Sequence, residues 1–396
     1  MYFRTLDKKE CSACGACLNV CPKRCISMKQ DEEGFLYPVI DKEICINCGL
    51  CEKVCPVSSP KYENEQSPKV YASYIKDEKE RMKSTSGGLF YAIATWIISQ
   101  GGIVYGAAFD ADFKLKHLGA ETVQDLQKLR GSKYVQSDIG RVFSEIKEQL
   151  EKGRWVYFTG VGCQVAGLKA YLRKDYAHLI TSDLVCHGVP SQLMFDWHID
   201  YLQQKEQAKI ISYSFRDCEG WEGCEIYRYV KNGKTRQRKL HGYSLSPYLH
   251  SFMYSYNLRY SCYDCKFAKI PRQGDFTLAD YWGVRRIYPN LDVSKGVSLV
   301  LVNNRKAENL WSHIEGLLEY KLSNIEDAAR ENGNLVHTTQ MPEIRKYCYE
   351  LIKERGYASV AEKEFRVKKY HMLKLKLLVA HSKIGPLLMK LKNIIR

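Results

Sequence analysis

Two copies of one cysteine motif constrain this chain more than any other feature. Residues 11–22 read CSACGACLNVCP and residues 45–56 read CINCGLCEKVCP, so both follow C-x2-C-x2-C-x3-C-P. Three thiolates at three-residue steps can hold three corners of one [4Fe-4S] cube, whereas the fourth thiolate is directed toward the other cube. The repeat therefore predicts two [4Fe-4S] clusters, whose ligands are, for the first, Cys11, Cys14, Cys17 and Cys55 and, for the second, Cys45, Cys48, Cys51 and Cys21.

A pair of zinc sites is the alternative interpretation, because C-x2-C pairs are common zinc ligands. Zinc, however, requires neither a third cysteine at the next three-residue step nor a proline after the fourth. Gly15 and Gly49 recur at matching positions, where the backbone must approach cluster sulfur closely. The pattern favours a bacterial two-cluster ferredoxin domain, and Cys25, which lies outside it, is expected to be a spare buried thiol.

Composition places the protein in a reducing compartment. The 396 residues are 45% hydrophobic, and no stretch approaches the roughly eighteen apolar residues that a membrane span needs or forms a signal peptide. We therefore expect a folded cytoplasmic protein. In the cytoplasm, 16 cysteines indicate metal or redox use rather than a disulfide framework.

The net charge of +15 raises the question of a nucleic-acid partner, and the position of that charge answers it. Residues 1–60 carry eight Lys/Arg and eight Asp/Glu, whereas residues 361–396 carry ten Lys/Arg and two Asp/Glu. More than half of the excess therefore lies on the last 36 residues. This uneven distribution argues against a zinc-binding nucleic-acid protein, and we expect no nucleic-acid partner.

The basic tail from Phe365 onward contains two segments broken at Gly385-Pro386. In the second segment an apolar face opposes Lys390, Lys392 and Arg396, and the apolar residues are Leu387, Leu388, Leu391, Ile394 and Ile395. Such a helix can lie on an anionic membrane surface, which would place the protein peripherally at the inner membrane surface. It can equally dock on the protein's own body or on another protein, and both interpretations stay open.

The remainder has a mixed α/β pattern. Helices are expected over 86–100, with Ser86 as N-cap, and over 139–153 and 163–174; strands are expected over 102–109, 154–160 and 178–188. This alternation predicts parallel crossover units covered by helices. Past residue 209 the pattern predicts antiparallel strands, with a hairpin turn at Asn232-Gly233 and further strands over 277–283 and 296–304.

The expected fold class is thus mixed α/β, or α+β, in four parts. They are a small two-cluster ferredoxin domain (1–60), a linker (61–69), a mixed-sheet body (70–330) and a basic helical tail (331–396). Clusters pass single electrons whereas most organic reductions need two, so a flavin between the ferredoxin domain and the substrate makes chemical sense. A GxGxxG fingerprint after a strand is absent, which leaves a Rossmann nicotinamide site without support.

Five segments of the body, in this order along the chain, resemble the coenzyme F420 hydrogenase/dehydrogenase beta-subunit family. They are KSTSGGLF (83–90), SKYVQS (132–137), TGVGCQVAGLK (159–169), DLVCHGVPS (183–191) and CYDCKFAKIPRQGDFTLADYWG (262–283). The resemblance implies an iron–sulfur flavoprotein oxidoreductase that binds FAD and exchanges electrons with a small organic molecule, such as coenzyme F420. A non-catalytic electron-transfer subunit that docks on a hydrogenase, a dehydrogenase or a ferredoxin is the second hypothesis.

Two groups of polar residues are predicted to bind the flavin. The first opens the helix over 86–100, where free backbone N–H groups suit a phosphate but also suit an ordinary N-cap; it comprises Ser84, Ser86, Gly87 and Gly88. The resemblance implies that this group holds the FAD pyrophosphate. The second follows in a polar loop and comprises Lys133, Tyr134 and Gln136. The resemblance alone implies that it holds flavin or substrate.

Four body cysteines form a candidate third [4Fe-4S] site: Cys163, Cys186, Cys262 and Cys265. Cys163 and Cys186 follow strands whose ends converge on one side of a parallel sheet, and the helix that starts at Cys163 is expected to lower its thiol pKa. The family resemblance supports a cluster here, whereas buried, unligated thiols are the other interpretation. His187 and Asp280 are the candidate catalytic residues, for a hydrogen bond to flavin, cofactor orientation or proton delivery.

Overall fold

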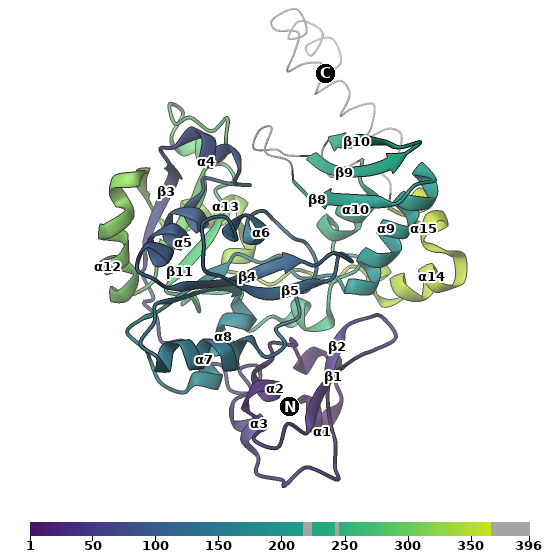
Figure 1. The fold of residues 1–396 in the computed structure, drawn as a ribbon, viewed down its shortest axis with the longest axis horizontal. Helices are drawn as coiled ribbons and strands as arrows, with labels where there is room; N and C mark the ends of the chain where they lie inside the picture. The colour runs from purple at the N-terminus through teal and green to yellow at the C-terminus, as the bar shows by residue number, and fades with distance from the viewer. Residues whose placement is uncertain (217–223, 242–244, 366–396) are drawn as a thin grey trace, which may run out of the picture.

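A mixed sheet of eight strands forms the centre of the protein (Figure 1). In the computed structural model, which describes residues 1–216, 224–241 and 245–365, the strand order is β13-β3-β12-β11-β7-β6-β4-β5. Neighbours among β11, β7, β6 and β4 are parallel and the other pairs are antiparallel. The strands are β3 (Lys69–Ile75), β4 (Ile103–Phe109), β5 (Leu115–Ala120), β6 (Val156–Val161), β7 (Leu179–Leu184), β11 (Phe276–Asp280), β12 (Ser298–Val302) and β13 (Leu318–Ser323).

Alternate residues of the central strands enter different hydrophobic clusters, which places helices on both faces of the sheet. Val156 and Phe158 pack with α7 and α8, whereas Tyr157 packs with α5 and α12. Both faces of a largely parallel sheet are therefore buried, as crossover connections require. The helices concerned are α5 (Leu89–Ser99), α7 (Val142–Glu151), α8 (Gly162–Leu172) and α12 (Arg305–Ile314), and shorter ones are α4 (Glu78–Met82), α6 (Leu126–Leu129), α11 (Val284–Ile287) and α13 (Ile325–Glu331).

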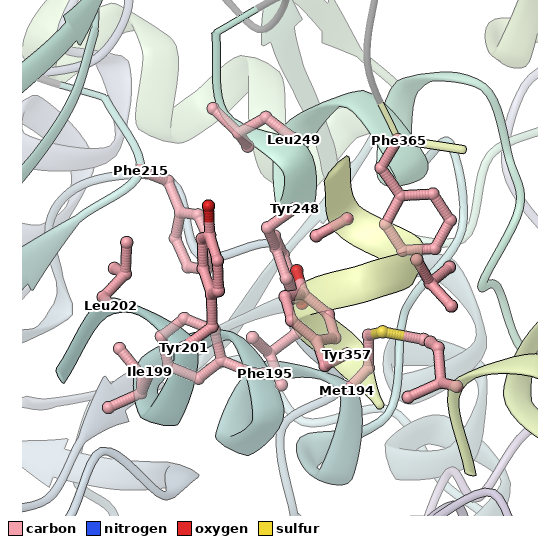
Figure 2. Packing of buried hydrophobic residues seen from close by; sticks show 14 of the residues in the cluster. Met194, Phe195, Ile199, Tyr201, Leu202, Phe215, Tyr248, Leu249, Tyr357 and Phe365 are labelled. Carbon is pink, nitrogen blue, oxygen red and sulfur yellow. The ribbon is translucent and has the colours of Figure 1, made fainter. Parts of the chain in front are cut away.

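A second cluster of buried residues lies beside the large sheet, under a small antiparallel sheet of order β10-β9-β8 (Figure 2). Phe195, Phe215, Tyr248 and Tyr357 pack there with their rings about 5 to 6 Å apart. The elements are β8 (Ile210–Ser214), β9 (Cys224–Lys231), β10 (Lys234–His241), α9 (Gln192–Glu206), α10 (Pro247–Met253), η2 (Tyr260–Asp264), η3 (Glu315–Leu317), η4 (Gly333–Leu335), η5 (Glu343–Lys346), α14 (Cys348–Arg355) and α15 (Tyr357–Lys363).

The N-terminal region forms a small unit below the large sheet, as Figure 1 shows in purple. It contains one antiparallel hairpin and short helices around the cysteine loops: α1 (Tyr2–Thr5), η1 (Lys8–Glu10), α2 (Ala16–Val20), β1 (Ile26–Gln30), β2 (Leu36–Ile40) and α3 (Leu50–Lys53). Gly15 and Gly49 have φ of +83° and +70° and precede α2 and α3. Only glycine adopts such a left-handed conformation without strain, which explains why both loops repeat it.

Specific contacts hold this N-terminal region against the body. The Asn19 side chain donates to the Gly140 carbonyl at 2.9 Å and accepts from the Ser144 hydroxyl at 3.0 Å. Gly167 of α8 lies so close to Cys14 that a Cβ atom there would come within 3.0 Å of the Cys14 Sγ. Helix α8 can therefore approach the first cysteine loop only because residue 167 is glycine.

The sequence analysis predicted the architecture well. The mixed α/β class, the ferredoxin-like region, the parallel units and the hairpin at Asn232-Gly233 are confirmed. Residues 61–69 lack a helix or strand up to β3, yet the side chain of Asn64 donates to the carbonyls of Arg272 and Gly274, so the segment is attached to the body. The amphipathic tail beyond Phe365 lies outside the described residues, and across the described part of the chain no helix is long and apolar enough to cross a membrane.

A buried ion pair connects the N-terminal hairpin to the C-terminal helices, and we predict that it contributes strongly to stability. Glu33 accepts two hydrogen bonds from the fully buried Arg345, at 2.9 and 2.6 Å. Glu33→Ala leaves that guanidinium buried without a carboxylate, so we expect a loss of about 3–5 kcal/mol in the free energy of unfolding in urea. Glu343→Ala, which removes an exposed pair with Lys346, should lose about 0–1 kcal/mol. Equal losses in the two variants would contradict the prediction.

Candidate cofactor sites

The four ligands predicted for the first cluster lie together in the structure. Burial raises the pKa of the Cys14 thiol to about 12, and the neighbouring Cys55 and Cys11 thiolates raise it further. Burial likewise raises the pKa of Cys17, to which Cys14, Cys11 and Cys55 also contribute. Each thiol is therefore within electrostatic reach of the other three, although Cys55 belongs to the second motif. Four buried thiols cannot all ionise without a cation, and an iron–sulfur core supplies one.

The second set surrounds a cavity of about 330 Å³ at the outer end of the N-terminal region. Its lining includes Cys21 from the first motif and Cys45, Cys48 and Cys51 from the second. Cys25 also lines the cavity, with its Sγ 3.3 Å from that of Cys21. The residues present thus fit a cubane of the predicted cross-motif type, and Cys25 is buried beside it, as expected for a spare thiol.

The geometry of these thiols does not favour zinc. A zinc–sulfur bond of about 2.3 Å places the sulfur ligands of a single ion roughly 3.8 Å apart. Among the residues that the structure describes, no three His, Cys, Asp or Glu side chains converge in the way that one metal ion requires. A cubane has an iron atom at each ligand, so its thiolates are farther apart than those around a single ion.

The four candidate thiols of the body, which we call the body thiols (Cys163, Cys186, Cys262 and Cys265), come from three separate parts of the chain. Strands β6 and β7 run in parallel, and Cys163 and Cys186 follow directly at their carboxyl ends. Gly188 lies against Cys262, whose Cβ would be 3.3 Å from a Cβ at residue 188. Arg272 fastens the remaining segment, because its guanidinium donates to the carbonyls of Phe267 and Leu184 at 3.0 and 2.9 Å.

Electrostatics place the body thiols within reach of one another and correct one expectation. Burial raises the pKa of Cys163 well above its usual range, and the nearby cysteines Cys265, Cys186, Cys14 and Cys262 raise it further. The expectation that the N-terminus of α8 lowers this pKa is therefore wrong, because burial and crowding by other thiols outweigh the helix dipole. Cys14 is among these neighbours, so the body thiols adjoin the ligands of the first cluster.

The two predicted flavin-binding segments meet beyond the carboxyl end of β3. The Arg130 guanidinium donates to the Ser84 hydroxyl at 2.9 Å, and the Ser132 hydroxyl donates to that of Thr85 at 3.1 Å. Helix α5 begins at Leu89 and its N-cap is Gly88, so the prediction of Ser86 as N-cap is wrong. Ser86 instead donates to the Val297 carbonyl, and the Gly87 N–H donates to Ser298. The N-terminus of α5 has no side-chain cap.

The polar loop after α6 divides its three predicted residues between two places. Lys133 donates to the carbonyls of Leu129, Arg130 and Gly131, and burial lowers its pKa to about 7. Gln136 lies at the boundary with the N-terminal region, where its amide donates to the Ser12 carbonyl and accepts from Arg259. The structure thus gives Gln136 contacts with the first cysteine loop.

Tyr134, His187 and Asp280 are connected through two residues that the sequence analysis missed, Phe252 and Arg216. The Phe252 ring stacks on Tyr134 at 4.7 Å and meets the edge of His187 at 5.2 Å. Arg216 pairs with Asp280 at 2.5 Å, and both Asp280 and Tyr134 raise its pKa against the opposing effect of burial. Neither Phe252 nor Arg216 belongs to a motif, so no signal in the sequence points to them.

His187 is held by neutral partners. One ring nitrogen lies 3.2 Å from the Asn334 amide oxygen, and the other lies within 3.1 Å of the Phe252 carbonyl and the Ser255 hydroxyl. Burial lowers its pKa below the ordinary value. The neutral imidazole therefore predominates near pH 7, which suits a hydrogen bond to a ligand better than proton donation by an imidazolium.

Comparison with known proteins agrees with this arrangement. Residues 10–59 match the family model described as 4Fe-4S dicluster domain, and residues 153–328 match the model for the C terminus of the beta subunit of coenzyme F420 hydrogenase/dehydrogenase. A chain of the F420-reducing [NiFe] hydrogenase complex from Methanosarcina barkeri is similar in structure, with 18% identity over 74% of this chain and 95% of that chain, and a TM-score of 0.45. None of the curated proteins matches the chain.

The sites and the two family matches define an iron–sulfur protein of the oxidoreductase class. Residues 10–59 form its dicluster domain. Residues 153–328 belong to the coenzyme F420 hydrogenase/dehydrogenase beta-subunit family, which confirms the resemblance seen in the sequence.

Cross-motif ligation can be tested with single substitutions. Because Cys55 lies with Cys14 and Cys21 lies with Cys45, we expect Cys55→Ser and Cys14→Ser to alter one EPR signal of the reduced protein. Cys21→Ser and Cys45→Ser should alter the other signal. Cys25→Ser is the control and should keep both. If Cys55→Ser instead altered the same signal as Cys45→Ser, each motif would hold its own cluster and the assignment would fail.

Proposed function

We propose that this protein is an iron–sulfur flavoprotein oxidoreductase. In this proposal the two clusters of the dicluster domain, a third [4Fe-4S] cluster on the body thiols and FAD connect a redox partner at the surface to a small organic substrate. When bound, FAD supplies the exchange between single electrons and a two-electron transfer to a molecule such as coenzyme F420.

The position of the body thiols is the observation that carries this proposal. On one side Cys163 adjoins Cys14, a ligand of the first cluster, and the intervening backbone contact is made at Gly167. On the other side Cys186 precedes His187, which contacts the same Phe252 ring as Tyr134. The body thiols therefore lie between the dicluster domain and the residues predicted to bind flavin or substrate.

The residues at the carboxyl edge of the sheet suit a cofactor that carries phosphate. Helix α5 has 11 residues and its first N–H groups lack a side-chain cap, so an anion at this end would be stabilised by the helix dipole. Lys133 lies on the loop that contacts this end of the helix through Ser132 and Thr85. Burial holds its pKa at about 7, and a neighbouring phosphate would favour its charged form.

The surface beside the second cluster suits a redox protein as partner. Cys48 is exposed, and the neighbouring Ile44 and Ile46 side chains are 49% and 56% exposed. Apolar side chains around an exposed cluster ligand allow a second protein to approach closely. This surface also agrees with the alternative function, that of an electron-transfer subunit without its own substrate.

Purification without oxygen, followed by cofactor analysis and a turnover assay, tests the proposed function. We expect about twelve irons per chain, a similar amount of acid-labile sulfide and one FAD, with coenzyme F420 reduced when reduced viologen supplies electrons. Full cofactor content without turnover of F420 or other two-electron acceptors would favour the electron-transfer subunit. A colourless, zinc-containing protein would refute both functions.

A substitution in the body thiols isolates the third cluster. Cys265→Ser removes one of the four predicted ligands, so we expect the iron content to fall by about four per chain while both dicluster EPR signals remain. Cys348→Ser is the matched control, because Cys348 is fully buried but packs in the aromatic cluster beside the small sheet. Unchanged iron content in Cys265→Ser would show that the body thiols hold no cluster.

A further inference from the structure

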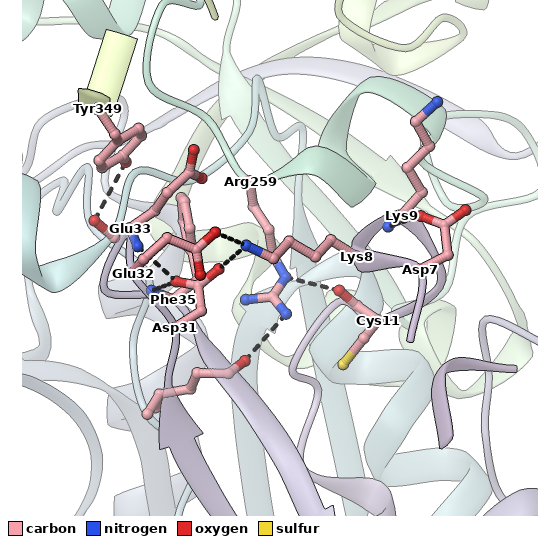
Figure 3. A network of polar contacts seen from close by, with 12 residues as sticks. Asp7, Lys8, Lys9, Cys11, Asp31, Glu32, Glu33, Phe35, Arg259 and Tyr349 are labelled. Atoms are coloured by element: carbon pink, nitrogen blue, oxygen red, sulfur yellow. Dashed lines mark hydrogen bonds and ion pairs between the residues drawn. The ribbon is translucent and has the colours of Figure 1, made fainter. Parts of the chain in front are cut away.

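Arg259 connects the N-terminal region, the body and the segment of the body thiols. Its side chain is fully buried. It donates to the Cys11 carbonyl at 2.7 Å, the Leu36 carbonyl at 3.0 Å and the Gln136 amide oxygen at 3.1 Å (Figure 3). The guanidinium carbon also lies 4.0 Å from the centre of the Tyr37 ring.

The charge of this guanidinium is not balanced by a carboxylate. Other buried arginines have one: Arg345 pairs with Glu33 and Arg272 pairs with Asp183. For Arg259, by contrast, no Asp or Glu of the described residues lies within 4.0 Å. Asp31, which belongs to the same polar network in Figure 3, pairs with Lys8. An isolated buried charge is costly, so an anion from another source is expected beside it.

The two nearest candidate anions are the clusters of the proposed function. Arg259 binds the backbone of Cys11, a ligand of the first cluster, and its own carbonyl accepts from the N–H of Cys262, one of the body thiols. A cubane with four thiolate ligands is negatively charged, because the thiolates outweigh the positive core, and reduction adds a further negative charge.

We propose that Arg259 is the shared counter-charge of the first cluster and the body cluster, and that it raises the reduction potentials of both. This inference rests on the proposed function, since it requires these clusters. A fixed positive charge in a buried site stabilises the reduced form more than the oxidised form. The second cluster adjoins an open cavity at the surface, where solvent screens charge. Arg259 therefore favours electrons on the two inner clusters.

The test is an EPR-monitored redox titration of the full-length protein and three variants. Arg259→Gln removes the charge but keeps hydrogen-bond donors, and we expect reduction of an inner cluster to become at least tenfold less favourable, which is about 59 mV for a one-electron couple. Arg259→Lys keeps the charge and should retain most of the potential. Arg141→Gln is the matched control, because Arg141 also donates to a backbone carbonyl of the dicluster domain, that of Leu18, but is only partly buried.

The outcomes separate a charge effect from a docking effect. A lowered potential in Arg259→Gln with retention in Arg259→Lys and Arg141→Gln supports the inference. Equal potentials in Arg259→Gln and the unmodified protein overturn it, as does an equal loss in Arg259→Gln and Arg259→Lys. If Arg259→Gln does not retain its iron, Arg259→Lys decides: its potential must match that of the unmodified protein. Absence of clusters from the unmodified protein would instead refute the proposed function.

Discussion

Burial of thiols in groups of four is the constraint on which the rest of this structure depends. A lone buried thiol is stable in its neutral form, but ligands must be thiolates, and burial raises the pKa of Cys14 and Cys262 to about 12. Only a cationic core makes ionisation favourable in such surroundings. Cluster assembly and folding are therefore coupled: the protein reaches these positions with neutral thiols and releases protons when iron binds.

This coupling explains why the contacts around the thiols are so closely fitted. Gly167 admits the first cysteine loop onto α8, and at Gly34 an added Cβ would come within 2.2 Å of the Leu193 Cβ. The ion pair of Glu33 with Arg345 and the hydrogen bonds of Asn19 fix the same boundary with polar groups. Such contacts require one relative position of dicluster domain and body, and electron transfer between fixed sites benefits from that rigidity.

The sequence predicted the parts of the sites that follow a local rule. The motif spacing determines the first and second ligand sets, and the period-2 pattern of β6 and β7 determines where Cys163 and Cys186 follow the sheet. Long-range packing decides the rest. The pKa of Cys163 depends on thiols from other parts of the chain, the start of α5 depends on Ser298 binding Gly87, and Gln136 contacts Ser12, more than a hundred residues earlier.

Arginines illustrate why such long-range features cannot be predicted from the sequence. Arg216, Arg259, Arg272 and Arg345 are all largely buried in this basic protein, and nothing in their sequence neighbourhoods separates them from its many exposed Lys and Arg. Burial of a guanidinium is tolerated only where acceptors converge from several segments, which is a property of the fold. Three of these four have a carboxylate, and the fourth lies between two groups of cysteines. The charges of the protein's interior are thus organised around its thiols, while the excess positive charge of the sequence lies mainly elsewhere.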